Sequence, residues 1–90
     1  MSDLQRHLQK SLQDPEFRKA WEERELKYQI ISEFIRLRNE KKMTQAELAE
    51  KAGTTQAVIS RLERGNANLT LAMMGRIAKV FGRRVQISFA

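Results

Sequence analysis

Four side chains within residues 56–61 have the chemistry needed to read the edges of DNA bases: Gln56, Ala57, Ser60 and Arg61. Glutamine donates and accepts in the fork that matches adenine, arginine donates twice to guanine, and an alanine methyl can touch the thymine methyl. If residues 56–64 form a helix, the apolar residues among them face a core and these four side chains turn outward. The set therefore predicts contacts to base pairs in the major groove.

Two short helices joined by a tight turn are needed to present such a reading helix to DNA. Thr44 followed by Glu47 is a capping box that predicts the start of the first helix, and Gly53 predicts its end. Ala49 and Ala52 are small enough for a second helix to approach closely. The stretch from residue 44 to residue 64 is therefore predicted to be a helix-turn-helix.

Contacts to phosphates would fix how this unit lies on the duplex. Backbone N–H groups at helix N-termini bind phosphate oxygens, and Gln45 and Thr55 stand at the starts of the two helices. We therefore expect both residues to position the protein on DNA without reading its sequence.

The residues before this unit carry helical signals. A short helix is expected over residues 4–12, and Asp14 with Pro15 predicts the start of another, because aspartate caps free N–H groups and proline lacks the donor that would be orphaned. The apolar spacing continues to Leu37 and fits either one long helix or two helices joined near Arg24.

The residues after it predict one more helix and a strand. Thr70 caps the helix, Gly82 ends it, and its expected apolar stripe consists of Leu71, Met74, Ile77, Ala78 and Phe81. In residues 83–90, Val85, Ile87 and Phe89 alternate with polar residues, which is typical of a strand. Pairing of this strand with a second copy would cover its edge and make a two-fold dimer, as recognition of two half-sites requires.

Composition narrows the function classes. The chain has 90 residues, no cysteine and a net charge of +6, which favours one domain, a polyanionic partner and no disulfide or thiolate zinc site. The first thirty residues carry six basic and six acidic side chains, so the excess of positive charge lies in residues 31–90.

We find no metal or cofactor site and no catalytic constellation, since His7 has no companion ligands and Glu22, Glu23 and Glu25 spread around a helix. No apolar run is long enough for a membrane span or signal peptide, which favours a cytoplasmic location.

The segment TQAELAEKAGTTQAVISRLERGN resembles the helix-turn-helix of lambdoid phage repressors and the wider XRE family. The resemblance implies a mainly α fold, with a five-helix domain over residues 30–82, a helical extension over residues 1–29 and the terminal strand over residues 83–90. It places Gln45 at a phosphate contact and Gln56, Ala57 and Arg61 at base-reading positions. It further implies phosphate contacts from the loop residues Asn66 and Asn68, and an internal ion pair between Arg38 and Glu63.

The segments DPEFRKAWEE and GRRVQISF on either side of this domain are similar to those of HigA-type antitoxins. That resemblance implies a bacterial, nucleoid-associated dimer that binds a HigB/RelE-like mRNA-cleaving toxin and represses its own operon at a palindromic operator. The candidate toxin contacts are Phe17, Trp21, Glu22 and Glu25. Phe17 and Trp21 are also compatible with an ordinary core, together with Leu26 and Phe34. The two carboxylates are also compatible with a solvated helix face. A stand-alone repressor without a toxin is the alternative.

Overall fold

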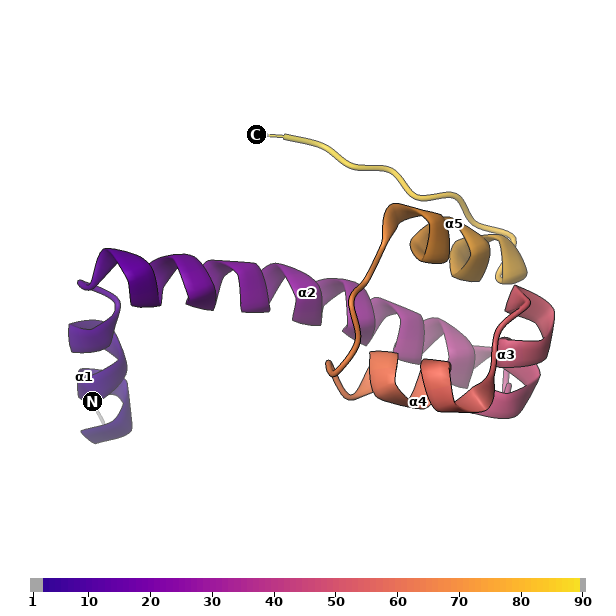
Figure 1. Cartoon of the computed structure of the whole chain (residues 1–90), viewed down its shortest axis with the longest axis horizontal. Helices are drawn as coiled ribbons and strands as arrows, with labels where there is room; N and C mark the ends of the chain where they lie inside the picture. Colours follow the sequence, from indigo (N-terminus) through magenta and orange to yellow (C-terminus); the bar gives the residue numbers. More distant parts are fainter. Residues whose placement is uncertain (1–2, 90) are drawn as a thin grey trace.

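The computed structural model describes residues 3–89 and contains five helices in that range (Figure 1). They are α1 (Asp3–Ser11), α2 (Pro15–Glu40), α3 (Gln45–Ala52), α4 (Gln56–Glu63) and α5 (Leu71–Val80). Residues 1 and 2 of the predicted extension and residue 90 of the predicted strand lie outside the described residues. The mainly helical fold is confirmed.

Helix α2 is a single unbroken helix of 26 residues, so the alternative of two helices joined near Arg24 is wrong. Asp14 caps its start by accepting a hydrogen bond from the backbone N–H of Glu16 at 2.9 Å, and Pro15 follows at the first helical position. At its other end Lys42, not a glycine, takes the left-handed conformation with φ of 52°. Helix α2 therefore belongs both to the predicted extension and to the predicted domain, and residues 30–82 contain its end plus three further helices instead of five.

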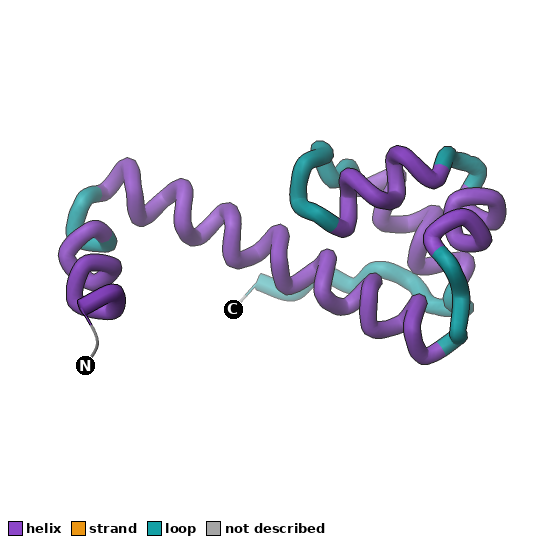
Figure 2. Tube along the Cα trace, turned by 90° about the horizontal axis from the view of Figure 1, so that it is seen from below, coloured by secondary structure: helices purple, strands orange, loops and turns teal. Residues whose placement is uncertain are grey.

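The hydrophobic core lies between the second half of α2 and helices α3, α4 and α5 (Figure 2). Helix α3 packs against α4 and α5, and α2 packs against α4. The buried apolar side chains are Ile31, Phe34, Leu37, Leu48, Ala49, Ala52, Ile59, Leu62, Met74, Ile77, Ala78 and Phe81. All of them follow residue 30, and Ile30 packs against them from the edge, so the core holds the helix-turn-helix unit and excludes most of the first thirty residues.

Helix α1 and the first half of α2 project from this core (Figure 1). The radius of gyration is 15.8 Å, whereas a compact chain of this length would have about 12 Å. The interpretation of Phe17 and Leu26 as core residues is wrong, because their exposed fractions are 40% and 60%, while Phe34 is buried as expected. Leu71 is also exposed, at 68%, because it begins α5 at the edge of the core.

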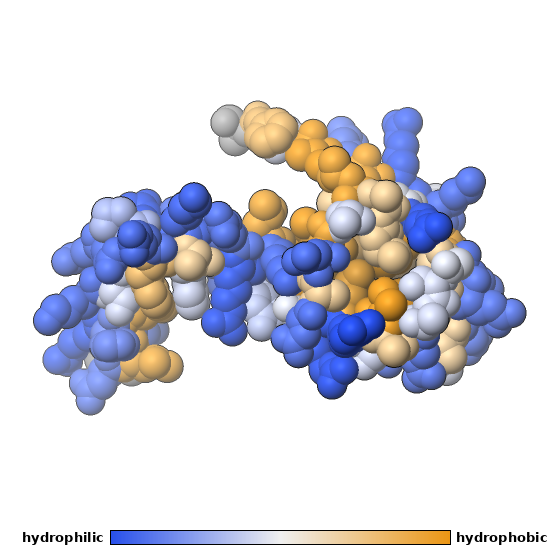
Figure 3. Space-filling model, viewed as in Figure 1, coloured by the Kyte–Doolittle hydropathy of each residue, from blue (hydrophilic) through white to orange (hydrophobic). Residues whose placement is uncertain are grey.

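Residues 83–89 form no strand, which corrects the prediction of a terminal β-strand. Alternating side chains are only half of what a strand requires, since the backbone must also pair with a neighbouring strand, and residues 3–89 contain none. These residues instead form a tail that lines a groove of about 840 Å³ together with α2 and α5. Val85, Ile87 and Phe89 are 40%, 57% and 94% exposed, and Figure 3 shows hydrophobic surface along the tail and on the domain beside it.

None of the helices in residues 3–89 combines the length and the apolar character that crossing a membrane would demand.

Candidate nucleic-acid interface

Helix α3 begins and ends where its capping residues predict. The backbone N–H of Glu47 donates to the Thr44 hydroxyl at 3.1 Å, and the backbone N–H of Thr44 donates to the Glu47 carboxylate at 3.2 Å. This reciprocal box satisfies two N–H groups that a helix start otherwise leaves without partners. Gly53 ends the helix with φ of 71°, in the left-handed region that favours glycine.

The turn between α3 and α4 is short because small residues line the contact. Ala49 and Ala52 are buried on α3, which packs against α4, and Thr54 N–H donates back to the carbonyl of Ala49 at 2.9 Å. Thr55 then caps α4, its hydroxyl accepting from the N–H of Val58 at 3.3 Å. The turn thus fixes the direction in which α4 leaves α3.

Helix α4 divides into a buried and an exposed face. Ile59 and Leu62 are 0% and 2% exposed and anchor the helix in the core. Three of the predicted base-reading residues, Gln56, Ala57 and Arg61, are exposed, and the fourth, Ser60, is half-buried. The Nε of Arg61 donates to the carbonyl of Ala57 at 3.4 Å, one turn back along the helix. The exposed face therefore presents an amide, a methyl and a guanidinium within two turns.

A partly buried ion pair supports this face from behind. The guanidinium of Arg38 binds both carboxylate oxygens of Glu63, with distances of 2.9–3.1 Å, and also donates to the carbonyl of Met43 at 2.9 Å. The side chains of Arg38 and Glu63 are only 16% and 7% exposed. The pair expected from the resemblance thus joins α2 to the end of α4, and it neutralises the one carboxylate of α4.

The amide of Gln45 joins the same network, which its sequence position does not indicate. Its Nε2 donates to Glu63 at 3.4 Å, and the residue is half-buried. Gln45 therefore stands at the start of α3 with one side of its amide turned toward Glu63. Gln45 and Glu63 are 18 positions apart in sequence, so no local pattern predicts their contact, which depends on the approach of α3 to α4.

The loop after α4 carries the two asparagines expected to contact phosphates. The N–H of Asn66 donates to the carbonyl of Arg61 at 2.8 Å and the N–H of Gly65 to that of Leu62 at 3.0 Å, which is the Schellman arrangement of a helix end. Asn66 and Asn68 are exposed. The loop thus starts from a defined geometry and places polar side chains beside the end of α4.

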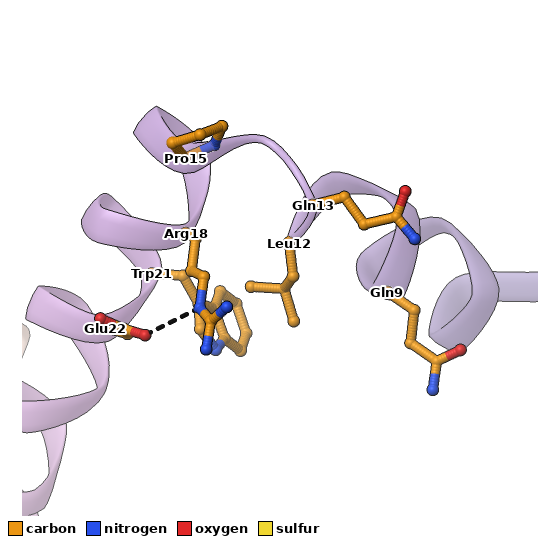
Figure 4. Close-up of a pocket in the computed structure, with 7 residues that line it drawn as sticks. All are labelled: Gln9, Leu12, Gln13, Pro15, Arg18, Trp21 and Glu22. Carbon is orange, nitrogen blue, oxygen red and sulfur yellow. Dashed lines mark hydrogen bonds and ion pairs between the residues drawn. The ribbon is translucent and has the colours of Figure 1, made fainter.

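The predicted toxin contacts lie on the projecting part of α2. The rings of Phe17 and Trp21 stack with centroids 6.4 Å apart and planes 14° apart. Figure 4 shows Trp21 and Leu12 facing each other across a shallow pocket where α1 turns into α2. Glu22 accepts a hydrogen bond from Arg18 at 3.1 Å, in a pair that is mostly exposed, and Glu25 is exposed.

Charged side chains on the outer face of α2 pair with one another along the helix. Arg36 donates to Glu40 at 2.9 Å and also to Glu33, whose pKa this hydrogen bond lowers. The same contact raises the pKa of Arg36. These pairs are solvated, with side chains about half exposed. Among residues 3–89 no three histidine or acidic side chains converge as a metal site would require.

Residues 35–87 match the helix-turn-helix family. Over 53 residues the chain is 40% identical to an uncharacterized HTH-type transcriptional regulator of Sinorhizobium fredii, a match that covers 59% of this chain and 69% of that protein. Over 47 residues it is 43% identical to an uncharacterized HTH-type transcriptional regulator of Archaeoglobus fulgidus, covering 52% and 67% respectively. No solved structure matches the chain.

Proposed function

Because this chain belongs to the helix-turn-helix family, we propose that it is a transcriptional regulator that binds a specific operator through α4. The observation that carries the proposal is the exposed face of α4, where Gln56, Ala57 and Arg61 lie over a helix anchored by Ile59 and Leu62. Glutamine, alanine and arginine suit adenine, thymine and guanine in the major groove.

Charge around α4 supports contact with phosphates. Arg61 and Arg64 are exposed, while the single carboxylate of the helix, Glu63, is bound by Arg38. A nearby free carboxylate would repel the duplex, so its internal neutralisation favours approach to DNA. The proposed phosphate contacts stand at the start of α3, at the start of α4 and in the loop after α4, and they are Gln45, Thr55, Asn66 and Asn68.

Selection from a pool of random duplexes tests this function directly. The protein should enrich a sequence motif with two-fold symmetry, and fluorescence anisotropy should show tighter binding to the enriched duplex than to a random duplex at the same salt concentration. No enrichment, or equal affinity for both duplexes, would contradict the proposal.

The symmetric motif follows from a proposed dimer. One helix-turn-helix covers a single half-site, so specific operators need two units about one turn of DNA apart. We place the contact at the apolar groove between α2, α5 and the tail, where Val85, Ile87 and Phe89 expose apolar surface. Each copy would supply both a groove and a tail, as a two-fold interface requires.

A narrower proposal is that the regulator is an antitoxin with a HigB/RelE-like toxin as partner and its own operon as target. The supporting observation is the pair of stacked rings, Phe17 and Trp21, on a helix that projects from the core. Phe17 is exposed and Trp21 is half-buried, and aromatic side chains are enriched in protein interfaces. The nearby carboxylates of Glu22 and Glu25 would suit a basic ribonuclease.

Co-expression with the gene adjacent to the regulator in its operon tests the antitoxin role. The neighbouring product should inhibit growth alone, and the full-length regulator should restore growth. A variant with Phe17→Glu and Trp21→Glu should fail to restore it, whereas Leu4→Glu, at a residue 77% exposed on α1, should succeed. A non-toxic neighbour would leave the stand-alone repressor as the function.

A further inference from the structure

Two consecutive residues of α2 contact the chain just after α4. The ammonium of Lys27 donates a hydrogen bond to the carbonyl oxygen of Gly65 at 2.9 Å, across 38 positions of sequence. The contact is partly buried, and Lys27 itself is half-buried on a stretch of α2 where its neighbours on both sides are exposed. Neither Lys27 nor Tyr28 falls within residues 35–87, which match the family.

The carbonyl that Lys27 binds lies at the point where α4 ends and the following loop begins. Gly65 has φ of 79° and its own N–H is used in the Schellman arrangement. Gly65 is the first residue after the Arg64 cap of α4, and its carbonyl oxygen accepts a hydrogen bond from a charged donor, which is stronger than one from a neutral donor. Lys27 therefore supplies a charged partner to a backbone group whose orientation sets the path of residues 66–68.

Tyr28 contacts the same point of the chain, Gly65, from another position on α2. A Cβ atom at Gly65 would lie 3.9 Å from the Tyr28 hydroxyl oxygen, so the ring packs beside the glycine. The guanidinium of Arg24 lies over that ring, 5.3 Å from its centroid, and donates to the hydroxyl at 3.4 Å. This point of the chain is thus enclosed by α2 on one side and by Arg64 and Asn66 on the other.

We propose that Lys27 is a positioning residue for DNA binding, which holds the loop after α4 so that Asn66 reaches a phosphate, with Tyr28 as the wall against which the loop rests. The inference rests on the proposed function, because it assigns Lys27 a role in contacts that only a DNA-bound protein makes. It makes the first half of α2 part of the DNA-binding apparatus.

The first experiment compares two variants that remove the same charge from the same helix. Lys27→Met keeps most of the aliphatic stem and loses the ammonium, and Lys19→Met does the same at an exposed position on the projecting half of α2. Lys27→Met should weaken binding to the selected duplex about fivefold, since only molecules with the loop in place bind. Lys19→Met should match the wild type, and both variants should show the wild-type helical spectrum.

A double-variant cycle separates positioning from direct contact with DNA. If Lys27 acts through the loop, Lys27→Met should have no further effect in a chain that carries Asn66→Ala. Lys27→Arg, which retains a cationic donor, should restore most of the affinity. An undiminished effect of Lys27→Met beside Asn66→Ala, or equal affinities of Lys27→Met and Lys19→Met, would overturn the inference.

Amide hydrogen exchange of the free protein tests the positioning of the loop without DNA, so its result is independent of the proposed function. Lys27→Met should speed exchange at the N–H groups of Gly65 and Asn66 and leave that of Thr54, which ends α3, unchanged. Absence of DNA binding by the wild type would refute the proposed function, whereas unchanged exchange at Gly65 and Asn66 would refute the positioning of the loop alone.

Discussion

At the scale of single residues, the proposed interface depends on the carboxylate of Glu63, which is not itself one of the proposed DNA contacts. Glu63 accepts from Arg38 and from Gln45, so one carboxylate fixes the end of α4 relative to both α2 and α3. A partly buried charge of this kind destabilises the fold when its partner is removed, because the remaining charge keeps its desolvation cost. The residues that read bases and the residues that hold the reading helix are therefore separable by mutation.

Arg38→Met should lower the free energy of unfolding by about 3 kcal/mol, since it leaves Glu63 without its cation. Urea denaturation followed by circular dichroism measures the change. Arg18→Met is the matched control, because it breaks the mostly exposed pair with Glu22 and should change stability by less than about 0.5 kcal/mol. Equal losses for the two variants would show that the Arg38 pair contributes no more than a surface contact.

Gln56→Ala and Arg61→Ala should each cost about 1–3 kcal/mol of binding to the selected duplex and relax the preference at one base pair. Gln45→Ala should weaken the selected and the random duplex by the same factor, since a phosphate contact carries no sequence information. Competition binding with a panel of single base-pair changes measures both effects.

Gln29→Ala, an exposed glutamine on α2, is the control and should leave affinity unchanged. The division between reading and positioning would fail if Gln56→Ala and Arg61→Ala reduced binding to both duplexes equally.

At the scale of elements, local sequence signals predicted where helices begin, whereas contacts between distant segments determine how the elements pack and whether a strand forms. Thr44 with Glu47 and Thr55 with its downstream N–H groups are contained within four residues, so the starts of α3 and α4 were predictable. The contact between Lys27 and Gly65 joins segments 38 positions apart and has no local pattern. The alternation in residues 83–89 is a local pattern without the neighbouring strand that would satisfy its backbone, which is why that prediction was wrong.

For the candidate site, the sequence predicted which side chains are exposed but not how the helices place them relative to one another. The exposure of Gln56, Ala57 and Arg61 follows from helical periodicity, because Ile59 and Leu62 must face the core. The half-buried position of Ser60 and the turn of Gln45 toward Glu63 depend on how α3 and α4 cross, which periodicity does not fix. The sequence also did not decide whether α2 continues through Arg24, because charged residues around that position are compatible with one long helix and with a junction between two helices.

The same substitution at two glycines should change stability in opposite directions. Gly53→Ala should destabilise the fold by about 1–2 kcal/mol, because φ of 71° at the end of α3 is strained for a residue with a Cβ. Gly75→Ala should stabilise it by about 0.5–1 kcal/mol, because Gly75 lies inside α5 where a Cβ meets nothing within 4 Å.

Thermal unfolding of the two variants side by side measures this difference. Since neither added methyl group meets a neighbour, a shift of the same sign in both would mean that backbone conformation does not govern the turn between α3 and α4.

At the scale of the whole molecule, the chain carries two exposed apolar features besides the proposed DNA-binding face, one on the surface of the core and one on the projecting helix. The groove beside the tail and the stacked rings on the projecting helix lie on different parts of the structure. A dimer contact at the groove would thus leave Phe17 and Trp21 accessible to a second kind of partner. The two proposals can be tested independently.

A chain carrying both Ile87→Ser and Phe89→Ser should dimerise more weakly than the wild type, because it removes exposed apolar surface at the proposed contact. Sedimentation velocity over a range of concentrations measures the change. Leu4→Ser makes an equivalent change on α1 and should leave the dimer unaffected. Wild-type dimerisation by the doubly substituted chain would remove the tail from the interface.

The unbroken course of α2 also sets a length. Residues 15–26, which precede the contacts of Lys27 and Tyr28 with Gly65, span about 18 Å at 1.5 Å per residue. A partner protein bound at the first turn of α2 would be held at a fixed distance from the domain. The number of helical residues would set how far that protein lies from the domain, and each residue inserted into α2 would add about 1.5 Å to the distance.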